Sequence, residues 1–123
     1  MKLTLLTCLS LILATPLISA ERAPWVGYWA ANAKWCARAG DVGEETPDRF
    51  DETGMYGLEW GCEITSVKPT GIGQSWAIRT ACMSMGDEYN ENALFMITQD
   101  DRLLVISEYG ETHDLIRCDK VPE

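Results

Sequence analysis

The sequence predicts an all-β fold: a single antiparallel meander of six to eight strands that forms a strongly curved sheet or small barrel, with one short helix near the N-terminus and two disulfides. Two observations lead to this prediction. Apolar and polar residues alternate along arms of about eight residues, and turns rich in Gly, Pro and Asp separate the arms. Four cysteines also follow an export signal, an even number that suits two bridges.

Residues 1–20 read as a cleaved secretory signal peptide. Lys2 precedes an apolar run over 3–13, Pro16 ends that run, and Ala20 is a small residue suited to cleavage. The run is shorter than the about 20 residues that a membrane-spanning helix needs. Residues 21–123 would then form a single disulfide-stapled β domain of 123 − 20 = 103 residues.

The first elements of this domain are a strand and a helix. The stretch 23–30 holds the triplet Gly27-Tyr28-Trp29 and reads as a strand. Residues 32–39 read as a short helix, and Gly40 closes it. An acidic loop over 41–46 follows, and residues 48–51 read as a short edge strand.

A hairpin over 56–85 is the centre of the predicted fold. Residues 56–65 and 74–82 place their large side chains at even positions, so those side chains share one face of each arm. The turn between the arms contains Pro69, Gly71 and Gly73, which favour a reversal of the chain. Three further strands are expected at 92–99, 102–109 and 112–118, each separated from the next by a Gly- or Asp-containing turn.

The cysteines Cys36, Cys62, Cys82 and Cys118 are expected to pair, because Cys8 belongs to the signal. Four cysteines allow three connectivities. We favour sequential pairing, Cys36–Cys62 and Cys82–Cys118. The alternative is a cross-strand Cys62–Cys82 bridge, since these two residues lie nearly opposite each other in the hairpin.

The charge of the exported chain restricts its partners. Without Lys2, nine basic residues face nineteen acidic ones, a net charge of −10. This balance argues against nucleic acid and anionic membrane surfaces, which need clustered Lys and Arg. It suits a basic protein partner attracted by the long-range field.

We expect the partner-binding residues to be acidic residues of the loops together with one aromatic residue. Trp29, Trp60 and Trp76 occupy inward positions, whereas Trp25 and Trp35 flank the first strand and are expected to be partly exposed. Tryptophan is frequent among residues that dominate protein interfaces. The predicted contact residues are Glu44, Glu45, Asp48, Asp87, Glu88 and Trp35.

No pattern in the sequence indicates catalysis, a cofactor or a metal. His113 is the single histidine, and its neighbour Asp114 would point to the other face of a strand. The paired carboxylates occupy predicted turns, where turn chemistry explains them. The chain lacks zinc spacing and an EF-hand loop.

The triplet with Trp29, together with Arg117 in the last strand, resembles the lipocalin-type (calycin) layout. In that layout a first-strand Trp packs against a late Arg. The chain also resembles small exported two-disulfide proteins of Gram-negative bacteria, including c-type lysozyme inhibitors and metalloprotease inhibitors. It lacks a counterpart of the Ser-Gly loop of the lysozyme inhibitors, since Gln74-Ser75-Trp76 matches it poorly.

From these features we expect a non-enzymatic periplasmic or secreted binding protein, monomeric or weakly dimeric. In the manner of the inhibitors, it would bind a basic protein such as a lysozyme. The alternatives are a calycin-like barrel that binds a small ligand and an envelope structural protein without a discrete ligand.

Overall fold

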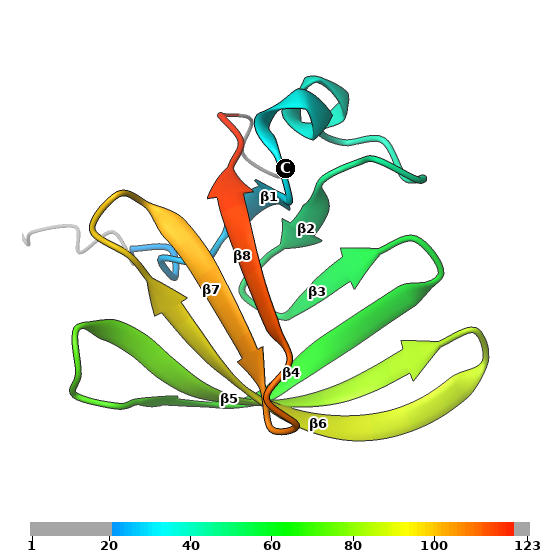
Figure 1. Cartoon of the computed structure of the whole chain (residues 1–123). Coiled ribbons are helices and arrows are strands. Elements are labelled where there is room, and N and C mark those ends of the chain that lie inside the picture. The colour runs from blue at the N-terminus through cyan, green and yellow to red at the C-terminus, as the bar shows by residue number, and fades with distance from the viewer. Residues whose placement is uncertain (1–20, 120–123) are drawn as a thin grey trace, which may run out of the picture.

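The structure, a computed structural model, describes residues 21–119 and shows eight antiparallel strands closed into one barrel (Figure 1). The predicted signal peptide lies outside the described residues. Each strand pairs with its neighbours in chain order, and the last strand pairs with the first. The strands are β1 (Gly27–Ala30), β2 (Asp48–Phe50), β3 (Gly54–Gly57), β4 (Trp60–Pro69), β5 (Gln74–Ser84), β6 (Asp87–Ile97), β7 (Arg102–Ser107) and β8 (Thr112–Arg117). The predicted fold class is therefore confirmed, and the sheet closes.

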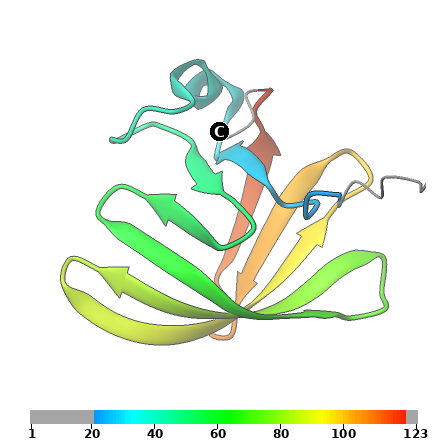
Figure 2. The ribbon, with the colours of Figure 1, turned by 180° about the vertical axis from the view of Figure 1, so that it is seen from behind.

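The short helix is confirmed as a 3-10 helix, η1 (Ala33–Arg38), between β1 and β2. The side chain of Asn32 caps it by accepting a hydrogen bond from the backbone N–H of Trp35, at 3.3 Å. None of its residues is fully buried. It therefore lies outside the barrel (Figures 1 and 2).

The central hairpin differs from the prediction in its first arm. Residues 56–65 do not form one strand, because a turn at Leu58 and Glu59 separates β3 from β4. Glu59 has a φ of 58° there. The turn changes the phase of the alternation, so Met55 faces the interior beside Cys62, and Tyr56 lies on the outer face beneath Arg49.

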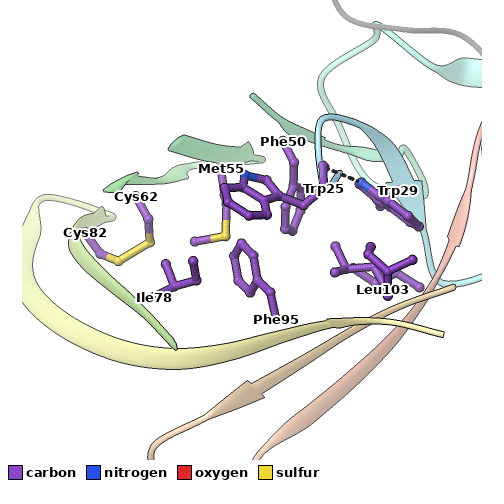
Figure 3. Packing of buried hydrophobic residues seen from close by; sticks show 11 residues of the cluster. Trp25, Trp29, Phe50, Met55, Cys62, Ile78, Cys82, Phe95 and Leu103 are labelled. Carbon is purple, nitrogen blue, oxygen red and sulfur yellow. Dashed lines mark hydrogen bonds between the residues drawn. A yellow bond between two sulfur atoms is a disulfide. The ribbon is translucent and has the colours of Figure 1, made fainter. Parts of the chain in front are cut away.

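The interior is most densely packed at one end of the barrel. Trp25, Trp29, Phe95 and Leu103 are at most 4% exposed, and Trp25 packs edge-on against Trp76 at a ring separation of 5.1 Å. Figure 3 shows Trp25 above Phe95, and the dashed line there marks the bond from Trp29 Nε1 to the Trp25 carbonyl oxygen, at 2.8 Å. The expectation that Trp25 is partly exposed is wrong. The segment before β1 folds over the barrel end and places this ring in the core.

Arg117 closes the same end from outside. Its guanidinium carbon lies 4.2 Å from the centroid of the Trp29 ring. It donates hydrogen bonds to the carbonyl oxygens of Val26, at 3.0 Å, and Pro24, at 2.8 Å. A Cβ atom at Gly27 would lie 3.1 Å from its Nη1 atom, so glycine makes room for this side chain. This Trp–Arg contact is the one that the calycin resemblance implies.

The two disulfides join Cys36 to Cys118 and Cys62 to Cys82. The predicted sequential pairing is wrong, and the cross-strand alternative is present. Cys62 and Cys82 are direct partners in the β4–β5 register, and both side chains face the interior. Cys36 is then left to Cys118, which follows β8 and lies beside the end of β1. Two disulfides indicate a non-reducing, exported environment.

Candidate functional site

Three turns meet at one side of the molecule and form a continuous surface. We define this turn surface as residues 41–47, 57–60 and 83–88. Val42 and Leu58 line one shallow groove, and the backbone N–H of Met85 donates to the carbonyl oxygen of Glu59, at 3.1 Å. Figure 1 shows all three turns at the right, away from the β4–β5 turn. The turn surface is therefore built by segments from three separate parts of the chain.

The turn surface exposes large apolar side chains. Val42 is 76% exposed, Met85 80% and Met83 53%, and Leu58 is 42% exposed. Met83 and Met85 also line a second groove with Glu59 and Trp60. Exposed apolar side chains that gather on one side of a molecule within a polar rim are typical of an interaction site. Methionine suits such a patch because its flexible side chain adapts to the partner's shape.

Acidic side chains surround these apolar residues. Glu44, Glu45, Glu59, Asp87 and Glu88 are all exposed. The nearby Arg38 side chain is engaged, with its guanidinium 3.6 Å from the Asp41 carboxylate and a bond to the Glu44 carbonyl oxygen, at 3.1 Å. The turn surface therefore combines an apolar centre with negative charge.

The backbone of the turn surface is strained. Glu45, Glu59 and Met85 have φ values of 55°, 58° and 50°, and only one other non-glycine residue in 21–119, Asp101, has a positive φ. The two-residue β5–β6 turn would favour Asn at the position that Met85 occupies, before Gly86. Strain of this kind concentrates at functional sites. Here it holds an apolar side chain at the tip of a hairpin, fully in solvent.

The predicted contact residues lie in three different places: on the turn surface, on η1 and in the barrel interior. Glu44, Glu45, Asp87 and Glu88 lie on the turn surface. Trp35 is half-buried on η1, which precedes the first of the three turns. Asp48 is separate from the loop acids, because it pairs with Trp29 in the β1–β2 register and lines a cavity inside the barrel.

The apolar members of the turn surface were not predicted from the sequence. Leu58 occupies an even position of the predicted first arm, which was expected to point inward, and Met83 and Met85 lie at the end of the predicted hairpin over 56–85. The signal that could have shown them is the sequence Met83-Ser84-Met85-Gly86. It puts a methionine directly before a turn glycine, where the side chain has no neighbouring strand to cover it.

The cavity lies inside the barrel, away from the rings around Trp25, and has a volume of about 360 Å³. Its walls are apolar at depth, with Phe50, Met55, Val105 and Leu115, and its exposed rim includes Tyr89, Glu111 and His113. The lining is completed by Asp48, Trp60, Cys62, Thr80, Glu91, Ala93 and Ser107. The paired carboxylates were expected in turns, and no local pattern indicated that Glu91, Glu111 and His113 line one cavity.

Burial raises the pKa of Asp48 to about 6, and the nearby His113 opposes this effect. A Cβ atom at Gly57 would lie 2.7 Å from Asp48 Oδ1 and 2.1 Å from Trp60 Nε1. Glycine at this position therefore lets the carboxylate and the indole approach each other. Within residues 21–119, no group donates a hydrogen bond to the Asp48 carboxylate.

The only histidine is not arranged as a catalytic pair with its neighbour. His113 lines the cavity, and Asp114 points outward, where it pairs with Arg102. In the described part of the chain, no three His, Cys, Asp or Glu side chains are grouped to hold a metal ion. Between residues 21 and 119 there is also no helix with the length and apolarity to cross a membrane.

Comparisons with family models, with curated proteins and with solved structures found no match for this chain.

Proposed function

We propose that the protein is a non-enzymatic periplasmic or secreted binding module that docks a basic protein partner, such as a c-type lysozyme, on the turn surface. The observation that carries this proposal is the set of exposed apolar side chains, Val42, Leu58, Met83 and Met85, among the loop acids. Exposing these side chains leaves apolar surface in water on one side of the barrel, and Met85 does so at a position with a strained backbone.

The two kinds of side chain have different roles in this proposal. The acids, within a chain of formal net charge −9, steer a basic partner and accelerate association. The apolar centre then loses contact with water in the complex and slows dissociation. This division differs from the sequence prediction, in which exposed aromatic side chains supplied the buried area.

The test is a titration of the oxidised protein against a basic c-type lysozyme, at low and at physiological salt, with lysozyme activity read alongside. We expect Met83→Ser/Met85→Ser to weaken binding about tenfold, mainly through faster dissociation. The matched control is Ile72→Ser, because Ile72 is 72% exposed on the β4–β5 turn at the opposite side.

A second pair of variants tests the steering. Glu45→Gln/Glu88→Gln should slow association at low salt and flatten the salt dependence, because fewer charges contribute to the field. Glu52→Gln removes an exposed acid from the turn between β2 and β3 and should change association less. Absence of binding, or binding that neither the methionine variants nor salt affect, would overturn the proposal.

A further inference from the structure

The cavity differs from the turn surface in position and in chemistry, and it suits a different kind of ligand. It lies inside the barrel and meets solvent at its exposed rim. Its volume of about 360 Å³ is at the small end of ligand pockets, which span roughly 300–1,000 Å³. A ligand of that size is a small molecule rather than a peptide segment.

The charge of the lining selects the sign of the ligand. Asp48, Glu91 and Glu111 contribute three carboxylates from β2, β6 and the β7–β8 turn, and His113 is the one basic side chain. No Lys or Arg is among the lining residues within 21–119. Asp48 is the most buried of these charges, and with two further carboxylates beside it such a lining attracts a cation and disfavours an anion.

Two aromatic side chains reinforce this selection. Trp60 and Tyr89 lie in the same walls, and the indole of Trp60 is close to the Asp48 carboxylate beside Gly57. An ammonium group at the Asp48 carboxylate is stabilised by ion pairing, and contact with the face of either ring would add cation–π attraction. The carboxylate of Asp48 has no donor of its own in the described chain, so a bound ammonium would supply one.

The deeper wall accounts for the rest of the ligand. Phe50, Met55, Val105 and Leu115 present only apolar atoms there, and the Cys62–Cys82 bridge lies beside them. An apolar group of the ligand can replace water against this wall. A metal ion or a hydrated inorganic cation would leave it unused.

From these contacts we infer that the cavity binds a small organic ammonium compound, with its charged group at Asp48 and its apolar body against Phe50, Met55 and Leu115. This site takes a different ligand from the proposed protein partner, and its test shares only the control Glu52→Gln with the lysozyme titration. The failure of one proposal therefore leaves the other standing.

The test is calorimetric titration of the oxidised protein at about pH 7.5 with 2-phenylethylamine and with its neutral analogue 2-phenylethanol. We expect the amine to bind with a Kd between about 10 μM and 1 mM, as its few atoms allow. The neutral analogue should bind at least about tenfold more weakly, because it gains nothing from the carboxylates.

Asp48→Asn should weaken amine binding by about tenfold or more and leave binding of the alcohol unchanged. This variant removes a buried charge and is expected to fold, which circular dichroism would verify. Glu52→Gln, outside the cavity, is the control with an equal change in charge. Equal binding of amine and alcohol, unchanged affinity in Asp48→Asn, or no binding up to about 5 mM amine would overturn the inference.

Discussion

The two halves of the barrel interior are built by the same strands but differ in chemistry. Along β6, the inward residues change from Tyr89 and Glu91 in one half to Phe95 and Ile97 in the other. Along β8 they change from His113 to Leu115. The half around Trp25 and Phe95 is filled with rings, and the half around Tyr89 and His113 contains the cavity. One strand can therefore contribute to the packed core at one end and line a cavity at the other.

The largest expected effect on stability comes from replacing one tryptophan by alanine, either in the packed core or at the wall of the cavity. Trp29→Ala removes a side chain that is 0% exposed and should destabilise the fold by about 3–5 kcal/mol. Trp60→Ala removes a half-buried side chain that borders existing empty space, and it should cost about 1–2 kcal/mol. Urea unfolding with the disulfides intact measures both. Equal losses would mean that the halves do not differ in packing.

The second expected effect is on the pH dependence of stability and comes from the Asp48 carboxylate in the cavity. Because the folded-state pKa of Asp48 is raised from 3.8 to about 6, this residue favours the folded state below about pH 4 and loses that contribution as pH rises through 6. Asp48→Asn should therefore stabilise the protein by about 3 kcal/mol at pH 8 and have no effect near pH 3.5.

Unfolding free energies of both proteins, measured between these pH values, check the prediction about Asp48. Asp51→Asn provides a contrast, because hydrogen bonds from Thr53 and Gly54 and the charge of Arg49 hold the pKa of that carboxyl below its usual range. Its replacement should cost stability at neutral pH. A parallel pH dependence in Asp48→Asn and the parent protein would contradict the assignment of a buried charge to this cavity.

The smallest expected effect on stability comes from the Arg117 side chain, which covers Trp29 at the end of the barrel. Arg117→Met keeps the apolar stem but removes the guanidinium from the Trp29 ring and from the carbonyl oxygens of Val26 and Pro24. We expect a loss of about 1–2 kcal/mol in thermal or urea unfolding. Arg79→Met, at an exposed position on β5, should stay within about 0.5 kcal/mol. Equal losses in Arg117→Met and Arg79→Met would show that the guanidinium contacts of Arg117 do not contribute to stability.

Strands were predicted best from the sequence where their inward-facing residues are large and apolar. β5 was recognised because Trp76, Ile78 and Cys82 alternate with small and polar residues. The first half of β6 was predicted as a turn, because Asp87 to Glu91 has the composition of a loop. Those residues are held in a strand by backbone pairing with β5, which does not depend on side-chain polarity.

The candidate sites could be predicted only in part, for a similar reason. The loop acids were visible as local composition. The inward position of Asp48 depends on its pairing with Trp29 across β1 and β2, which are distant in sequence. The burial of Trp25 depends on the course of the segment before β1. Both are tertiary facts that no local pattern encodes.

The disulfides have one consequence for survival among proteases. The Cys62–Cys82 loop is nested inside the much longer loop closed by Cys36 and Cys118, which are 82 residues apart in sequence. A single cut at any peptide bond between residues 36 and 118 therefore leaves one covalent molecule, because the bridge still joins the two fragments. Exposed turns such as the one that carries Met85 lie within this range. The chain can present strained, accessible loops to other proteins and still remain intact as a covalent unit after one of them is nicked.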